Sequence, residues 1–429
     1  MKNAIRALAL LLLAASLTAQ PKTIVLKAAR LFDGTSNEII RNATVVITGN
    51  KIAGINVAVP AGADVIDLGD ATLLPGFIDC HVHLTNQAGD NYYLDFFNNV
   101  MRQPAEQAHY AAMYARRTID AGFTTVRNVG ADDYVDVGLR NAINAGIVVG
   151  PRMLVAVHAI SATGGHADKD PFPPNLSPQA GPIDGVCNGP DECRAAVRYQ
   201  IKYGADVIKF MPSGGVLSLA DPVDAPEFSQ GEMNAIVEEA HHWGRKVAAH
   251  CHGDVAAKMA IAAGVDSIEH GSFLKPDTLA LMKEKGVYLV PTLMAGETVG
   301  AKADKFPAAI AVKARAAHDA MFGMFHNAVN AGVKIALGTD SAVSPHGLNA
   351  HEFGLMVANG MTPAAALRAG TQSAATLLGM IDRIGTIENG KLADIVAVPG
   401  NPLDDIRTTE HVTFVMKDGV VVKRVGAGS

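Results

Sequence analysis

The chain has 429 residues, of which 49% are hydrophobic and 18% are charged, and its formal net charge is −6 at pH 7. This length allows two or three ordinary domains or one large α/β barrel, and the composition is that of a folded globular protein. Nucleic-acid binding would need a basic patch or stripe, and the sequence contains no cluster of Lys and Arg interleaved with aromatic residues. We therefore expect a globular protein that does not bind nucleic acid.

The first 20 residues have the layout of a secretory signal peptide. Lys2 and Arg6 form a basic start, and an apolar run from Ala7 to Leu17 leads into small residues such as Ala19. The run is too short to span a bilayer as a helix, and no later apolar run is long enough to do so. The alternatives are a buried N-terminal helix or an uncleaved anchor. We predict a periplasmic or secreted protein, with no membrane attachment after residues 1–20 are removed.

Four cysteines follow, namely Cys80, Cys187, Cys193 and Cys251. Cys187 and Cys193 flank a turn-rich stretch and would be able to form a bridge in an oxidising compartment, but the sequence leaves their pairing open. The other two each adjoin a histidine, and we expect both to be small buried residues on strands.

Both ends of the chain contain short runs rich in β-branched residues, which are typical of strands. These predicted strands cover residues 23–26, 43–47, 51–55, 395–398, 412–416 and 420–422. Turn residues at 48–50 and 417–419 predict hairpins between neighbouring runs. We therefore predict a small β-sandwich domain built from residues 21–74 and 384–429.

Between these ends, over residues 75–383, helical stretches alternate with strands. The predicted strands that follow a helical stretch cover residues 124–127, 206–210, 246–250, 267–270 and 334–338. Repeated βα units imply a parallel sheet, and this many in one run favour an α/β fold with a closed (β/α)8 TIM-like barrel. The alternative is an open doubly wound sheet, but no glycine-rich phosphate-binding sequence follows any strand.

A His-x-His pair, His81 and His83, ends a strand-like run that starts near Leu73. Because side chains alternate along a strand, both imidazoles face one side, where they form half of a metal site. Four more ionisable residues lie at or near the C-terminal ends of predicted strands, namely Lys209, His250, His270 and Asp340. In a barrel, catalytic groups gather at that face. Since such residues are costly to bury unless they are paired or bind a metal, they indicate an active site.

Several motifs resemble those of the amidohydrolase superfamily. The run from Leu74 to His83 resembles its opening metal motif, residues 338–341 resemble its final-strand aspartate motif, and residues 385–394 are similar to its usual return into the β-sandwich. Residues 161–166 and 207–215 resemble the prolidase-like branch. That branch includes Xaa-Pro dipeptidases, carboxypeptidases that act on N-acyl amino acids, and ochratoxin-degrading amidohydrolases. The resemblance covers essentially the whole chain after the N-terminal segment.

The resemblance implies a metal-dependent amidohydrolase with two divalent ions, zinc by default. The implied ligands are His81, His83, Lys209, His250, His270 and Asp340. The first two histidines, with the aspartate beside them, would hold one ion and the other two the second, with Lys209 bridging both as a carbamate formed with carbon dioxide. A metal-bridging hydroxide would attack the amide of a dipeptide or N-acyl amino acid, and Asp340 would pass a proton to the leaving nitrogen. Homo-oligomers are common in this superfamily, so we expect one here.

Two further histidines are candidates for catalytic roles. His166 follows a Gly-Gly pair and either helps to stabilise charge on the carbonyl oxygen or is a loop residue with no substrate role. His252 lies two residues beyond His250 on the same strand face, and it either points into the site or orients a ligand from outside. We expect the Pro- and Gly-rich residues 168–184 and residues 217–227 to form a lid or pocket walls that select the substrate.

Two alternative functions were weighed against this one. The first is a mononuclear cyclic-amide hydrolase or deaminase, similar to imidazolonepropionase. The superfamily's mononuclear deaminases typically lack the bridging lysine and place a glutamate just after the fifth-strand histidine, whereas here Lys209 is present and Cys251 follows His250. The second is a non-catalytic relative, which would have lost ligands, yet all six are present. We therefore predict an enzyme.

Overall fold

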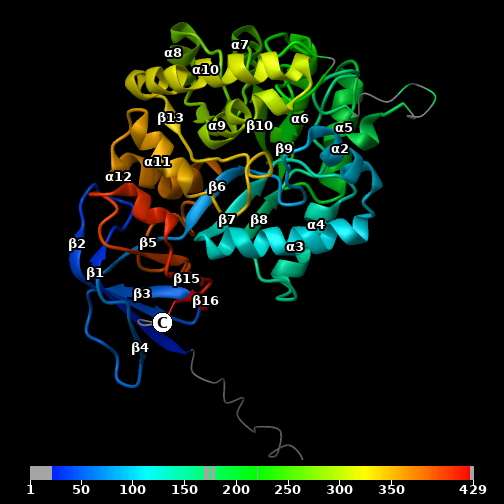
Figure 1. Ribbon diagram of the computed structural model, residues 1–429. Helices are drawn as coiled ribbons and strands as arrows, with labels where there is room; N and C mark the ends of the chain where they lie inside the picture. Colours follow the sequence, from blue (N-terminus) through cyan, green and yellow to red (C-terminus); the bar gives the residue numbers. More distant parts are fainter. Residues whose placement is uncertain (1–21, 169–172, 174, 176–178, 220, 426–429) are drawn as a thin grey trace, which may run out of the picture.

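The computed structural model describes residues 22–168, 173, 175, 179–219 and 221–425. The predicted signal peptide lies outside the described residues, and so does part of the predicted lid between residues 168 and 184. Figure 1 shows a β domain, in which the blue and red ends of the chain lie side by side, next to a larger α/β barrel. The fold class is the predicted one.

The β domain contains one eight-stranded sheet. Its strands are β1 (Thr23–Leu31), β2 (Ile40–Thr48), β3 (Lys51–Ile55), β4 (Asp64–Asp67), β5 (Ala71–Pro75), β14 (Ile395–Pro399), β15 (Phe414–Lys417) and β16 (Val420–Arg424). They follow the order β16-β15-β14-β5-β1-β2-β3, and β4 pairs with β1. Antiparallel pairing of Leu74 with Val396 joins the two chain ends. Side chains such as Leu26, Ile395 and Phe414 form a separate hydrophobic core, as expected of a β-sandwich.

The barrel contains eight parallel strands in the described part of the chain. They are β6 (Phe77–Val82), β7 (Phe123–Asn128), β8 (Arg152–Val155), β9 (Val207–Phe210), β10 (Lys246–Cys251), β11 (Ser267–His270), β12 (Tyr288–Val290) and β13 (Lys334–Ile335). Strands β6–β8 form one sheet and β9–β13 form another. The Asp206 N–H donates to the Val155 carbonyl over 2.8 Å, and the Cys80 N–H donates to the Leu337 carbonyl over 2.8 Å. These two hydrogen bonds connect the sheets at both edges, so the strands follow one another around the barrel.

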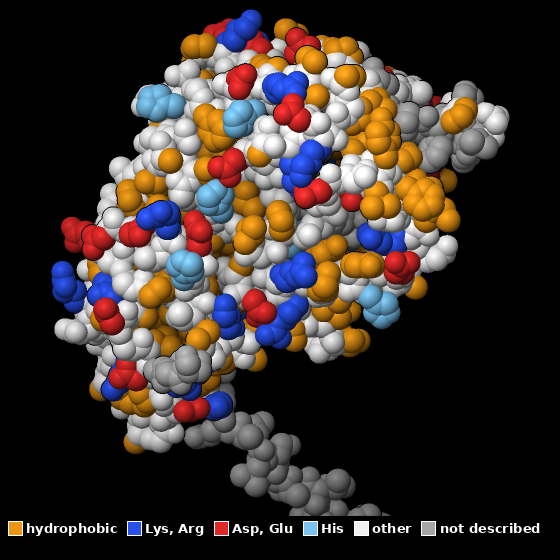
Figure 2. All heavy atoms as spheres, viewed as in Figure 1, with side chains coloured by type: hydrophobic (Ala, Val, Ile, Leu, Met, Phe, Trp, Pro, Cys, Tyr) orange, Lys and Arg blue, Asp and Glu red, His pale blue; other side chains and the backbone are white. Residues whose placement is uncertain are grey.

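Helices cover the outside of the barrel (Figure 1). They are α2 (Tyr92–Met101), α3 (Pro104–Asp120), α4 (Val135–Asn144), α5 (Pro190–Lys202), α6 (Gln230–His242), α7 (Asp254–Ala263), α8 (Pro276–Lys285), α9 (Leu293–Ala301), α10 (Ala308–Ala331), α11 (His351–Ala358), α12 (Pro363–Arg368) and α13 (Ala374–Leu377). Short helical turns are η1 (Pro182–Asp184), η2 (Ala303–Lys305), η3 (Ala369–Ser373) and η4 (Ile406–Glu410). Among the helices described, none combines the length and apolar character needed to cross a membrane. On the face shown in Figure 2, Lys and Arg side chains are interspersed with Asp and Glu.

The predicted strand limits differ from the observed ones at several places, and at two of them hydrogen bonds give the reason. The run that starts near Leu73 is two strands, because the chain passes from the β domain into the barrel at Gly76, whose N–H donates to the Asp394 carbonyl over 2.8 Å. The run predicted over residues 334–338 is a strand only for Lys334–Ile335. The strand ends early because the N–H of Leu337 donates to the Ala369 carbonyl over 2.9 Å and so does not pair with β12.

The passage between the domains depends on the absence of a side chain at Gly76. A Cβ on this residue would lie 2.2 Å from Oγ1 of Thr124, a buried residue of β7. We expect Gly76→Ala to lower the free energy of unfolding by about 1–3 kcal/mol, because one strand must shift to relieve the overlap. Urea denaturation measures this change.

Gly138→Ala is the matched control. Gly138 lies within α4, and an added Cβ would meet no atom within 4 Å. Because alanine favours helices, this variant should be neutral or more stable by up to about 1 kcal/mol. Equal urea midpoints for the two variants would contradict the account of Gly76.

Candidate active site

A cavity of about 510 Å³ lies at the carboxyl ends of the barrel strands. The residues predicted for the site all line this cavity, namely His81, His83, His166, Lys209, His250, His252, His270 and Asp340. They come from β6, β9, β10 and β11 and from the segments that follow β6, β8, β10 and β13. Parallel strands end at the same face, which explains how residues far apart in the sequence meet there.

The His-x-His pair faces the aspartate that follows β13. Nε2 of His81 and Nε2 of His83 each lie 3.6 Å from Oδ1 of Asp340. The N–H of Asp340 also donates to the carbonyl of His81 over 2.7 Å, which ties the last strand of the barrel to the first. The spacing therefore directs both imidazoles to one point, as the alternation of side chains predicts.

Two groups of side chains have ligand atoms within 4.8 Å of one another. One group contains His81, His270 and Asp340, and the other contains His250, His252 and His270. His270 belongs to both, so the two groups adjoin. Lys209, which is 1% exposed, lines the same cavity.

The donor set fits metal ions. Nε2 of His250 is buried and has no hydrogen-bond partner among the described residues. A buried imidazole nitrogen in this state is costly unless it is bound. Imidazole and carboxylate ligands suit zinc and other divalent transition metals. The structure thus brings together the side chains that the family resemblance assigns to two ions, and it adds His252 to one group.

The second nitrogen of most of these imidazoles is held in place. His81 Nδ1 lies 2.8 Å from Glu269 Oε2, and His83 Nδ1 lies 3.0 Å from the Gly130 carbonyl oxygen. His252 Nδ1 lies 2.9 Å from Ser272 Oγ, and His270 Nδ1 lies 2.7 Å from Thr292 Oγ1. Such contacts fix the ring orientation and the tautomer, which leaves Nε2 to face the cavity.

Glu269, the residue before His270, was not among the predicted site residues. It is fully buried, and its Oε1 accepts from Nη2 of Arg127 over 2.7 Å while its Oε2 contacts His81. Nε of Arg127 donates to the Cys80 carbonyl over 2.5 Å. The sequence could have indicated this role, because a glutamate on a strand predicted to lie inside the barrel needs a cationic partner when it is buried.

Asp79, also missed, supports the segment that carries Asp340. Its Oδ2 accepts from Thr339 Oγ1 over 2.7 Å and from Asn349 Nδ2 over 2.8 Å, and its Oδ1 accepts from the Thr339 N–H over 3.1 Å. Burial nevertheless raises the pKa of Asp79 to about 6. The carboxylate therefore holds the start of the segment that carries Asp340.

Burial keeps the imidazoles of the cavity neutral at pH 7. It lowers the pKa of His83 to about 4 and that of His252 to about 3. Burial also lowers the pKa of His166 to about 4, and it lowers the pKa values of His81, His250 and His270 well below 6.5. Neutral imidazole is the form that binds a metal.

The lysine and the aspartate shift in opposite directions. Burial lowers the pKa of Lys209 to about 8, so a fraction of its amine is neutral and nucleophilic near pH 7. Burial raises the pKa of Asp340 to about 7, partly offset by the positive charge of Lys209. Both groups can therefore exchange protons near neutral pH.

His270, Thr292 and Asp340, all at the cavity, adopt left-handed backbone conformations that non-glycine residues rarely adopt. The φ angle is 68° at His270, 50° at Thr292 and 55° at Asp340. Each such conformation costs about 1–3 kcal/mol and persists only where its surroundings impose it. At Thr292 these surroundings include Glu352, which accepts from the next two backbone N–H groups over 2.8 Å each.

His166 lies in the cavity wall. Its ring stacks on that of His250 with centroids 4.3 Å apart, and its Nδ1 lies 2.8 Å from Ser218 Oγ. Its N–H donates to Oε1 of Glu227 over 2.7 Å, and burial raises the pKa of that glutamate to about 8. The loop that carries His166 is thus fixed at the site.

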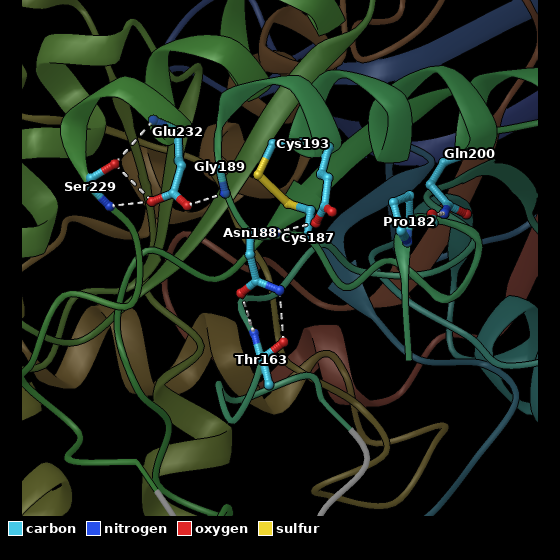
Figure 3. The surroundings of a disulfide bond; sticks show 10 residues. Thr163, Pro182, Cys187, Asn188, Gly189, Cys193, Gln200, Ser229 and Glu232 are labelled. Carbon is cyan, nitrogen blue, oxygen red and sulfur yellow. Dashed lines mark hydrogen bonds between the residues drawn. A yellow bond between two sulfur atoms is a disulfide. The ribbon is translucent and has the colours of Figure 1, made fainter. Parts of the chain in front are cut away.

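A disulfide joins Cys187 to Cys193, with their Cα atoms 5.1 Å apart (Figure 3). Asn188, next to it, accepts from the Thr163 N–H over 3.4 Å and donates to Thr163 Oγ1 over 2.9 Å. The bonded segment therefore holds the loop that leads to His166. The two remaining cysteines, as expected, are buried and unpaired: Cys80 and Cys251.

Comparisons with known proteins identify the family of the chain. The sequence model of the amidohydrolase family matches residues 72–424. Ochratoxinase from Aspergillus niger is 34% identical over 435 residues, covering 96% of this chain and 89% of that protein. The crystal structure of a Xaa-Pro dipeptidase with bound methionine in the active site is 41% identical, with a TM-score of 0.90, and covers 94% of this chain and 100% of that chain. A prolidase complexed with N-methylphosphonate-L-proline is 32% identical, with a TM-score of 0.86 and the same coverage.

These matches confirm the predicted resemblance to the prolidase-like branch and the predicted barrel with its β-sandwich domain. They also confirm that the protein is a hydrolase acting on carbon–nitrogen amide bonds. The match spans most of the chain, and the histidine clusters fit the metal dependence that is general in this family. The chain belongs to the amidohydrolase family.

Proposed function

We propose that this amidohydrolase cleaves the amide bond of a dipeptide or an N-acyl amino acid, with two divalent metal ions, zinc by default. The observation that carries the proposal is the meeting of all six expected ligand residues in one cavity at the carboxyl ends of the barrel strands. The similarity to a Xaa-Pro dipeptidase and to ochratoxinase supports this substrate class.

In this proposal His81, His83 and Asp340 hold one ion, and His250 and His270 hold the other. Lys209 would contribute as a carbamate, formed when its neutral amine adds to carbon dioxide and releases a proton, because an ammonium cannot bind a cation whereas a carbamate offers two anionic oxygens. Metal ions bound there supply a Lewis acid for the scissile carbonyl and lower the pKa of water.

The chain's own residues position the substrate and move the proton. Asp340 takes the proton of the attacking water at a carboxylate oxygen and delivers it to the leaving nitrogen. His166 and His252 bind polar atoms of the substrate through Nε2, because Ser218 and Ser272 engage their Nδ1 atoms.

The first prediction concerns metal content. Purified protein should contain about two metal ions per chain, and Lys209→Ala should lose metal and activity together, because the shared ligand is gone. Elemental analysis measures the metal, and hydrolysis of Xaa-Pro dipeptides and N-acyl amino acids measures activity. Lys246→Ala, at an exposed lysine that begins β10, is the control and should change neither. One ion per chain regardless of Lys209, with no amide cleavage, would instead favour the mononuclear cyclic-amide hydrolase or deaminase.

The second prediction distinguishes the role of His250, on β10, from that of His252, which follows the strand. His250→Ala should reduce metal content, since Nε2 of His250 has no other partner among the described residues. His252→Ala should keep the metal and lower kcat/KM about 100-fold or more, because the residue serves the substrate. Loss of metal in both variants would make His252 a ligand and contradict the role proposed for it.

We also propose that the chain is exported and that residues 1–20 are removed. The Cys187–Cys193 disulfide supports this, because disulfides persist in oxidising compartments. Mass spectrometry of the exported protein should find an N-terminus near residue 21. A full-length chain confined to the cytoplasm would contradict it. The predicted homo-oligomer stays a prediction that sedimentation can test.

A further inference from the structure

One wall of the cavity is formed by the loop that follows β9. Val216 and Leu217, within residues 215–218, line the cavity; we name residues 215–218 the wall segment. Helices α9 and α10 add further apolar lining residues, namely Ala295, Val299, Ala317 and Met321. Together these side chains form an apolar surface beside the ionisable groups of the site.

The lining offers little compensation for a charged substrate side chain. Among the described residues that line the cavity, Lys209 is the only lysine or arginine and Asp340 is the only acid. Both belong to the reacting centre. A charge placed against the apolar surface would lose its hydration without gaining a partner, whereas an apolar group gains from leaving water.

Lys313 of α10 reaches across to the loop and holds it. Its Nζ donates to the carbonyls of Gly215, Ser218 and Asp221 over 2.7, 2.6 and 3.0 Å. It also lies 3.7 Å from Oδ1 of Asp221. Three charge-assisted hydrogen bonds to one short stretch fix its backbone more firmly than neutral contacts would.

Three further contacts fix the position of the wall segment. The Gly215 N–H donates to Oδ2 of Asp221 over 2.5 Å. A Cβ on Gly215 would lie 2.0 Å from the ring of His166, so the backbone packs directly on that imidazole. Ser218 Oγ contacts Nδ1 of the same ring. A shift of the wall segment would therefore move both the apolar surface and His166.

We propose that Lys313 is a positioning residue that holds the wall segment as a preformed subsite for an apolar side chain or acyl chain next to the scissile amide. The inference rests on the proposed amide hydrolysis. The inference adds that the substrate carries an apolar group on one side of the scissile amide. It also adds that Lys313 maintains the preference for this group. Rigid support of this kind is what keeps a binding surface in its productive position.

The test compares matched substrates. Leu-Pro against Gly-Pro varies the acyl side of the amide, and N-acetyl-leucine against N-acetylglycine varies the amine side. Wild-type enzyme should prefer the leucine compound in at least one pair. Lys313→Met should reduce that preference about tenfold, mainly through a higher KM for the leucine compound, at unchanged metal content, because the apolar contacts loosen.

Arg315→Met is the matched control, since Arg315 lies on the same helix and pairs with the exposed Asp304. It should leave the preference unchanged. Asp221→Asn is a second variant that keeps the side-chain shape and removes the ion pair with Lys313. It should reduce the preference in the same direction, and it decides the outcome if Lys313→Met does not fold.

Three results would overturn the inference. The wild type would show no preference in either pair, or the variants at Lys313 and Asp221 would keep the wild-type preference. In the third result the variants would lose metal and would lose activity equally on the leucine and glycine compounds. Failure of the proposed function looks different. In that case the metal-loaded wild type cleaves none of the four compounds.

Discussion

The need to compensate buried charge at the carboxyl ends of the barrel strands governs much of this structure. Glu269 is fully buried, and it is tolerable there because Arg127 meets one carboxylate oxygen and His81 the other. Asp79, two residues before His81 on β6, is also buried and is held by hydrogen bonds from Thr339 and Asn349. These pairs orient the groups that face the cavity, so the cost of burial is offset by contacts that also fix the geometry.

The same principle extends outward from the site in successive contacts. Thr292 holds His270, and Glu352 holds the backbone just after Thr292, so the strained conformation at that residue is imposed by its neighbours. On the other side of the cavity, Lys313 holds the wall segment, and Ser218 within that segment contacts His166. Residues outside the cavity thereby determine where the side chains inside it lie.

The two domains and the disulfide make this arrangement possible. The chain enters the barrel at Gly76, where close packing on Thr124 leaves no room for a side chain. The strand that follows delivers His81 to the cavity. The disulfide at Cys187 and the hydrogen bonds between Asn188 and Thr163 secure the opposite loop, which leads to His166 (Figure 3). Two local constraints far apart in the sequence thus act on one site.

The amino-acid sequence by itself determined the alternation of strands and helices, the joining of the chain ends in one β domain, and the ionisable residues that line the cavity. These features follow from local periodicity and from the type of residue at each strand end, which are readable along the chain. Short strands such as β8 and β12 lacked enough residues to show a period, and they were missed.

Only the tertiary structure decided the partners. Glu269 supports His81, His270 belongs to both ligand groups, and Lys313 holds the wall segment. Each of these contacts joins residues that are far apart in the chain. The sequence likewise did not decide whether Cys187 and Cys193 pair, and the structure shows that they form a disulfide. Contacts of this kind arise when the barrel brings its strand ends to one face, and no local pattern encodes which side chains will then touch.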